Sequence, residues 1–146
     1  MNILLDNPLL RIDNNNAMTS PVKPLVVDNL SFRYRDRQGA AIHNISFEAK
    51  PGEILLIAGA SGCGKTTMIR AINGLIPRSY KGEMGGQILV FGEEVKNWKL
   101  SQISQKIGTV LQDPERQILG TKVLNEVAFG LENLAMPRDE IFTRVD

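Results

Sequence analysis

One short stretch of the chain combines glycine, lysine and hydroxyl side chains at the spacing of a phosphate-binding loop. It follows the pattern Gly-x-x-x-x-Gly-Lys-Thr, which begins at Gly59 and ends at Gly64, Lys65 and Thr66. Glycines let the backbone turn tightly, so that successive N–H groups can point into one anion-binding concavity. We therefore predict a nucleoside triphosphate site in which Lys65 contacts the outer phosphates and Thr66 binds Mg²⁺. The expected nucleotide-binding residues here are Gly59, Ser61, Gly62, Cys63, Gly64, Lys65, Thr66 and Thr67.

The segments on either side of this stretch have the pattern that a phosphate-binding loop requires. The continuous apolar run Ile54–Ala58 predicts a strand that is buried on both faces. A helix should follow the loop and stop at Asn73, Gly74 and Pro77, because its apolar residues recur at helical spacing. These apolar residues are Met68, Ile69, Ile72, Leu75 and Ile76. The N-terminus of such a helix adds unpaired N–H groups and a positive dipole end, which favours phosphate binding over a chance glycine-rich turn.

Cys63 lies inside the loop and admits two interpretations. It is either a small residue at a variable position or a reactive thiolate, favoured by the Lys65 ammonium and the helix N-terminus. The second interpretation predicts that alkylation blocks nucleotide binding and that bound nucleotide slows alkylation. The chain has one cysteine, so it cannot form an internal disulfide or a multi-cysteine metal site. Its one histidine, His43, argues against a His-based metal site or triad.

Length, charge and hydropathy limit the remaining function classes. The 146 residues correspond to about one domain, with an apolar fraction of 42% that is ordinary for a globular protein. Lysine and arginine number 17 against 16 acidic residues, and this balance argues against nucleic-acid binding. The chain lacks both an apolar run of transmembrane length and the pattern of a signal peptide. We therefore expect a cytoplasmic protein whose only link to a membrane is a partner.

The rest of the chain predicts a flexible leader followed by strands and helices. Residues 1–24 form the leader, in which Met18 is an alternative start. Strands at 25–34 and 41–50 should pair as an antiparallel hairpin. Further downstream we predict a glycine-rich turn at 82–86, strands at 87–91 and 107–111, a loop at 112–117, and helices at 100–107, at 122–135 and from 138 onward.

The residues before the loop resemble the start of an ABC-type ATPase domain. The matching segments are Leu30–Tyr34, Ile42–Phe47 and Pro51–Glu53. In that family an aromatic residue at the position of Tyr34 stacks on adenine; the alternative is a strand tyrosine that packs on its own sheet. The resemblance implies an α/β fold, namely a P-loop NTPase core of ABC type with an N-terminal antiparallel β subdomain. It also implies ATP and Mg²⁺ as ligands.

A second matching segment, Val110–Gln117, looks like the Q-loop of the same family. The resemblance implies that Gln112 contacts Mg²⁺ and the attacking water, and that it couples the site to a transmembrane partner. An amide side chain suits this role because it offers both a donor and an acceptor. Lys65 and Gln112 would then be the catalytic residues, and Thr66 and Gln112 the metal ligands.

Within this family the chain is most similar to the ATPase subunits of energy-coupling-factor importers, which drive uptake of vitamins or transition-metal ions. The segments that match this branch are Asn73–Pro77, Asp113–Gln117 and Asn125–Asn133. The resemblance implies a transmembrane coupling subunit and a second ATP-binding subunit as partners, at the cytoplasmic face of the cell membrane. Phe129 lies off the apolar face of its predicted helix and is a candidate contact for the membrane subunit. Burial under a neighbouring loop is the alternative.

Three motifs that an ABC ATPase needs for turnover are missing from the sequence. These are a signature motif of the Leu-Ser-Gly-Gly-Gln type, a Walker B strand ending in an acidic pair, and a switch histidine. We expect residues 25–146 to be the N-terminal portion of the domain, truncated before the signature motif and Walker B. Turnover by this portion alone should be slight. Two alternatives stay open, an ATP-binding or docking module without turnover and a soluble ABC-type ATPase outside transport.

Overall fold

The computed structural model describes residues 22–110 and 112–145 of the chain. Two compact units are present, Met1–Gly108 and Thr109–Asp146, and each is described by itself. The predicted leader falls almost entirely outside the described residues, as do Leu111 and Asp146.

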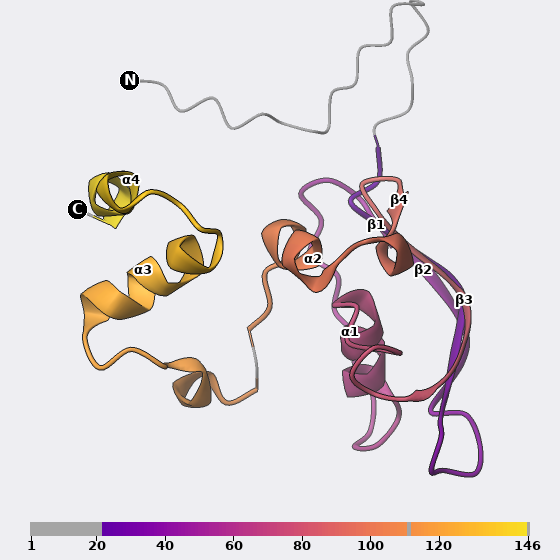
Figure 1. Cartoon of the computed structure of the whole chain (residues 1–146). Helices are drawn as coiled ribbons and strands as arrows, with labels where there is room; N and C mark the ends of the chain where they lie inside the picture. Colours follow the sequence, from indigo (N-terminus) through magenta and orange to yellow (C-terminus); the bar gives the residue numbers. More distant parts are fainter. Residues whose placement is uncertain (1–21, 111, 146) are drawn as a thin grey trace, which may run out of the picture. The chain divides into compact units, whose positions relative to one another are not determined.

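A four-stranded antiparallel sheet forms the first unit together with the helices that pack on it (Figure 1). The strands lie in the order β2-β1-β3-β4, so that β1 pairs with both β2 and β3. The predicted hairpin of the first two strands is therefore confirmed. The strand bounds are Leu25–Tyr34 for β1, Ile42–Ala49 for β2, Gly82–Val90 for β3 and Glu93–Glu94 for β4.

Two asparagine bulges adjust which side chains the first hairpin buries. Asn29 and Asn44 have positive φ angles of 49° and 50°, and the strand register shifts at both positions. Asparagine tolerates this backbone region better than most residues do. The N–H groups of Asn29 and Asn44 donate to the hydroxyls of Ser46 and Ser31, each over 2.8 Å. The bulges thus keep their backbone donors satisfied while the core face stays continuous.

The predicted turn at 82–86 is wrong, because these residues form the first half of β3. Glycine serves close approach at this end of the sheet, where β3 pairs with β1. A Cβ on Gly82 would lie 2.4 Å from the Phe32 ring, and one on Gly86 would lie 2.4 Å from the Asn29 carbonyl oxygen. The glycines that suggested a turn therefore make room for the neighbouring strand.

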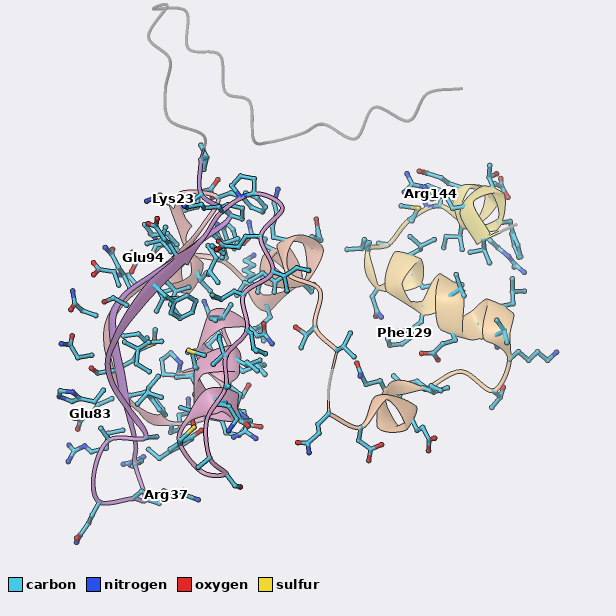
Figure 2. All side chains as sticks on the ribbon, turned by 180° about the vertical axis from the view of Figure 1, so that it is seen from behind. Lys23, Arg37, Glu83, Glu94, Phe129 and Arg144 are labelled. Atoms are coloured by element: carbon cyan, nitrogen blue, oxygen red, sulfur yellow. The ribbon has the colours of Figure 1, made fainter. Side chains whose placement is uncertain are left out.

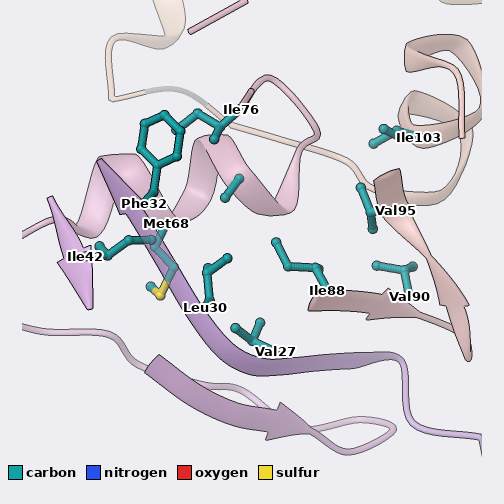
Figure 3. Packing of buried hydrophobic residues seen from close by; sticks show 11 residues of the cluster. Val27, Leu30, Phe32, Ile42, Met68, Ile76, Ile88, Val90, Val95 and Ile103 are labelled. Atoms are coloured by element: carbon teal, nitrogen blue, oxygen red, sulfur yellow. The ribbon is translucent and has the colours of Figure 1, made fainter. Parts of the chain in front are cut away.

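Helix α1 (Lys65–Ile72) covers one face of the sheet and closes the core (Figure 3). It begins after the loop and ends at the first predicted stop signal, with Asn73 as its C-cap and Gly74 at a φ of +66°. Leu75 and Ile76, which were expected on the helix, lie beyond its end. Ile69, expected on its apolar face, is instead 48% exposed. The buried cluster consists of Val27, Leu30, Phe32, Ile42, Met68, Ala71, Ile76, Ile88, Val90, Val95 and Ile103.

A single arginine side chain, that of Arg78, fastens the chain after α1. Its guanidinium donates to four backbone carbonyl oxygens at distances of 2.7–3.2 Å. The rigid fork of five N–H donors in arginine allows one side chain to serve several acceptors. The acceptors belong to Gly74, Val95, Lys96 and Trp98, so Arg78 joins the end of α1 to the turn η1 (Val95–Asn97).

Two predicted strands are not formed. Residues 54–58 have no regular structure, and Ile54 and Leu56 are 96% and 85% exposed. Residues 107–110, which follow α2 (Leu100–Lys106), are likewise irregular. A doubly buried strand needs neighbours on both sides, and no described strand pairs with either segment. An apolar composition was therefore not sufficient to form these strands.

The second unit contains the turn η2 (Pro114–Gln117) and the helices α3 (Val123–Asn133) and α4 (Arg138–Val145). The predicted helices at 122–135 and from 138 are thus confirmed. The α3 carboxylate of Glu126 accepts hydrogen bonds from the backbone N–H groups of Leu119 and Gly120, at 2.9 and 2.6 Å. None of the helices in the described part of the chain is both long and apolar enough to cross a bilayer.

Candidate functional site

The glycine-rich loop at residues 59–64 leads directly into α1. Gly62 and Gly64 have φ angles of +82° and +101°, which glycine adopts without strain. A Cβ on Gly64 would also lie 2.5 Å from the carbonyl oxygen of Ala41, at the entry to β2. Gly64 thus has a steric reason besides its backbone angle, whereas a Cβ on Gly62 would meet open space. Together the two glycines turn the backbone around the N-terminus of α1.

The Lys65 ammonium joins the end of this loop to its beginning. Its Nζ donates to the carbonyl oxygens of Gly59 and Ala60, both at 2.7 Å. Its third contact is the thiol of Cys63 at 3.5 Å, and sulfur is a weak acceptor. Two donors of the ammonium thus fix its position, and the third lacks a strong acceptor.

The N-terminus of α1 presents positive potential that no acidic side chain in its first turn offsets. The first N–H groups of a helix have no partner within the helix, and the dipole adds a positive partial charge there. Thr66, on this turn, is exposed, whereas Thr67 is only 7% exposed. The arrangement suits an anion on the side of the loop.

A cleft of about 480 Å³ opens beside the loop and α1. Its lining includes Gly62, Gly64 and the first hydroxyl residues of α1, together with Tyr34 and the turn between β1 and β2. Figure 2 shows Arg37 on this turn. The charged lining residues are Arg37, Lys65 and Arg70 against Asp36, so the cleft carries three cations and one carboxylate. This excess of positive charge favours a polyanionic ligand.

Tyr34 stands at the end of β1 and reaches from the sheet to α1. Its hydroxyl lies 3.1 Å from Thr67 Oγ1 and accepts a hydrogen bond from Arg70 Nη1 at 3.3 Å. Its ring meets Phe32 edge-on, with centroids 4.9 Å apart, and the Arg37 guanidinium lies 5.8 Å from its centroid. The tyrosine therefore both packs on its own sheet and lines the cleft; the predicted stacking on adenine stays a prediction.

The surroundings of Tyr34 shift its pKa in opposite directions. Burial raises the pKa of the phenol, whereas the hydrogen bonds with Thr67 and Arg70 and the positive charges of Arg70 and Arg37 lower it. The lowering contributions prevail, so the pKa of Tyr34 lies below that of an ordinary tyrosine. The site thus stabilises negative charge on this hydroxyl.

The structure places the remaining predicted residues as follows. Gly59, Ser61 and Cys63 lie in the loop but not among the residues that line the cleft. Gln112 is exposed and belongs to the second unit, so its predicted contact with Mg²⁺ stays a prediction. Among the described residues, no group of three histidine, cysteine, aspartate or glutamate side chains could hold a metal ion.

Two cations of the cleft, Arg37 and Arg70, were not predicted from the sequence. Arg70 follows Thr67 by three residues, a spacing that places both on one face of the predicted helix. Its contact with Tyr34 joins residues 36 positions apart, which no local pattern discloses. Arg37 lies in a polar turn and had no periodic pattern to mark it.

The profile of the ABC transporter family matches residues 42–144, and the chain belongs to this family. A curated relative from Pyrococcus horikoshii, provisionally named an ABC transporter ATP-binding protein, is 42% identical over 119 residues. That match covers 82% of this chain and 42% of the relative. A relative of the same provisional name from Sulfurisphaera tokodaii is 48% identical over 69% of this chain and 21% of its own length. The chain thus spans less than half the length of these relatives.

Solved structures confirm the predicted fold class. CbiO1 from Clostridium perfringens, described as part of the ABC transporter complex cbiONQ, matches 84% of this chain and 47% of its own. The TM-score is 0.68 at 31% identity. A bacterial Atm1-family ABC exporter with ATP bound gives a TM-score of 0.58 at 31% identity, over 80% of this chain and 19% of its own. Both support the mixed α/β fold with an antiparallel sheet; domains of this family use nucleotide and Mg²⁺ in general.

Proposed function

We propose that this chain is the nucleotide-binding part of the ATP-binding subunit of an ABC importer of the energy-coupling-factor type. The observation that carries the proposal is the Lys65 ammonium, fixed on two loop carbonyls beside the N-terminus of α1. The similarity to CbiO1, part of an ABC transporter complex, supports the importer branch. ATP binding and hydrolysis would then drive the uptake of a vitamin or a metal ion.

The chain's own residues suit the parts of MgATP as follows. Phosphate oxygens would accept from the loop and helix N–H groups and from Lys65, where they would replace the weak thiol acceptor of Cys63. The exposed hydroxyl of Thr66 is the expected ligand of Mg²⁺, which neutralises phosphate charge when it is bound. The ring of Tyr34, which lines the cleft at the end of β1, would lie against adenine.

Isothermal titration calorimetry of the folded chain with MgATP tests this site. We expect saturable binding that the variant Lys65→Ala weakens. The variant Lys96→Ala removes one exposed cation from η1, away from the cleft lining, and serves as the control. A folded wild type that gives no heat at millimolar MgATP would contradict the proposal.

The proposed partners are a transmembrane coupling subunit and a second ATP-binding subunit, at the cytoplasmic face of the membrane. Phe129 on α3 is 44% exposed, so it is accessible for contact with the membrane subunit (Figure 2). Aromatic side chains often supply a large share of the binding free energy of an interface, so this ring would stabilise a contact with a partner helix.

Co-purification in detergent with integral membrane proteins encoded next to this gene tests the importer assignment. The variant Phe129→Ala should weaken the complex and leave MgATP affinity unchanged. Leu134→Ala is the matched control, because Leu134 is an apolar residue of nearly equal exposure, 45%, just after α3. Equal weakening by both variants, or a loss of nucleotide affinity with Phe129→Ala, would contradict the assigned role of Phe129.

A further inference from the structure

Two aromatic side chains and two α1 side chains form one connected group at the edge of the cleft. Arg70 donates to the Tyr34 hydroxyl at 3.3 Å, and its guanidinium lies 4.2 Å from the ring centroid of Tyr80. The same hydroxyl lies 3.1 Å from the side chain of Thr67, which is almost fully buried. The Tyr34 hydroxyl is therefore fixed from two points on α1, and one of these points is itself held by a second ring.

We propose that Arg70 is a positioning residue for the nucleobase, which acts by holding the Tyr34 ring in place. This inference rests on the proposed function, because Tyr34 serves a base only if the cleft binds ATP. Arg70 would contact neither the base nor the phosphates; its effect on affinity would pass through the tyrosine hydroxyl.

The physical reason is the freedom that a tyrosine ring otherwise has at the end of a strand. Holding the hydroxyl fixes where the ring lies, and the edge-on contact with Phe32 limits its rotation. An aromatic side chain that must instead be ordered on binding loses affinity through entropy. A guanidinium stacked on an aromatic ring is itself restrained, so it can hold its acceptor firmly. The contacts of Arg70 with Tyr34 and Tyr80 thus order the ring before the ligand arrives.

The same helix would also align the two ends of the ligand site. Lys65, Thr66 and Thr67 lie on the first turn of α1 and Arg70 on the second. A rigid helix therefore fixes the distance between the predicted phosphate contacts and Arg70, which holds the predicted base contact. Tyr34 itself lies on β1, so Arg70 would link the end of this strand to the helix that carries the predicted phosphate contacts.

Calorimetry with two probes separates this role from phosphate binding. MgATP has a base, whereas magnesium tripolyphosphate has the phosphate chain alone. We expect Arg70→Gln to weaken MgATP binding about five- to tenfold, the value of one lost hydrogen bond, and tripolyphosphate binding less than about twofold. The control is Arg33→Gln, since Arg33 precedes Tyr34 on β1 and pairs with Glu83 on β3. Removing this cation should change neither affinity appreciably.

A double variant tests whether the effect passes through the hydroxyl. Tyr34→Phe removes only the hydroxyl and should weaken MgATP binding to a similar extent. The double variant Arg70→Gln with Tyr34→Phe should bind no more weakly than the weaker single variant, since both remove one interaction. Independent losses that multiply in the double variant would overturn the proposal. So would an equal loss of both probes in Arg70→Gln, or no loss at all.

Titration of the phenolate by ultraviolet absorbance gives a readout that does not depend on ligand. The chain has two tyrosines, and Tyr34→Phe identifies the signal of Tyr34. Arg70→Gln should raise the pKa of Tyr34, because it removes a donor and a positive charge that favour the phenolate. An unchanged pKa overturns the contact. If the wild type binds neither probe, the proposed function itself is wrong, whereas MgATP binding that ignores Arg70→Gln overturns this inference alone.

Discussion

The sheet and the segment at 54–58 are both rich in branched apolar residues, but the sheet buries them and the segment leaves them exposed. Leu30 on β1 is completely buried, whereas Leu56 is 85% exposed. β1 has β2 and β3 as hydrogen-bonded neighbours and α1 over its inner face. Segment 54–58 has no strand neighbour among the described residues. The comparison teaches that apolar residues become core only where other elements supply pairing and cover.

The loop that follows segment 54–58 keeps its form even though that segment is open. Its shape comes from local causes, namely the backbone angles of its glycines and the two hydrogen bonds that the Lys65 ammonium donates to loop carbonyls. The predicted binding function therefore depends less on the packing of segment 54–58 than on α1 and the loop itself.

The same substitution in the two regions should give the largest contrast. Leu30→Ala should lower the free energy of unfolding by about 3 kcal/mol, because it leaves a cavity in a closed core. Leu56→Ala should change it by less than about 0.5 kcal/mol, since the side chain is already in water. Urea unfolding followed by circular dichroism measures both. Similar losses for the two leucines would show that segment 54–58 is packed in solution.

Two glycines of the loop should likewise differ in how much an alanine lowers the free energy of unfolding, because only one of them has close neighbours. Gly64→Ala should cost about 2–3 kcal/mol, because a Cβ there meets both a positive φ and the nearby backbone of Ala41. Gly62→Ala faces open space and should cost about 1 kcal/mol, from its φ alone. Thermal unfolding of the two variants makes the comparison. A costlier change at Gly62 would refute the packing of the loop against β2.

Lys65→Ala should separate binding from stability. We expect MgATP affinity to fall at least about tenfold, the effect of a lost charge-assisted hydrogen bond. The free energy of unfolding should change by less than about 1 kcal/mol, because the freed carbonyls of Gly59 and Ala60 belong to exposed residues. Calorimetry and urea unfolding of one preparation test both parts. Loss of the fold together with binding would show that the ammonium is structural.

Alkylation of Cys63 should give the smallest effect, a change of rate. The thiol is exposed and lies 3.5 Å from the Lys65 ammonium. Bound MgATP should slow its reaction with iodoacetamide severalfold by covering the loop, and the alkylated chain should bind MgATP poorly. Mass spectrometry with and without MgATP follows the rate. Nucleotide affinity that survives complete alkylation would favour the interpretation of Cys63 as a small residue at a variable position.

Local patterns predicted the elements whose causes are local. The end of α1 followed from the stop signals at Asn73 and Gly74, although the helical spacing extended to Ile76. The first hairpin followed from alternation around a polar turn. The glycines at 82–86 led to the wrong prediction of a turn, because a strand that closely approaches β1 needs glycine just as a turn does. The Tyr34–Arg70 contact could not be predicted, since it depends on how β1 and α1 pack. The conformation of the glycine-rich loop was predictable because its glycines and Lys65 act on the backbone nearest to them, whereas phosphate binding there stays a prediction.

Arg78 has a consequence for how freely its neighbourhood can vary. It engages only main-chain oxygens, so the side chains of Lys96 and Asn97, both exposed, take no part in what the arginine holds. Drift at those two positions should therefore be tolerated, while the arginine itself cannot be exchanged even for lysine, whose three donors do not fan out in a plane. Selection on this turn should therefore act mainly on Arg78 and much less on the side chains whose backbone it binds.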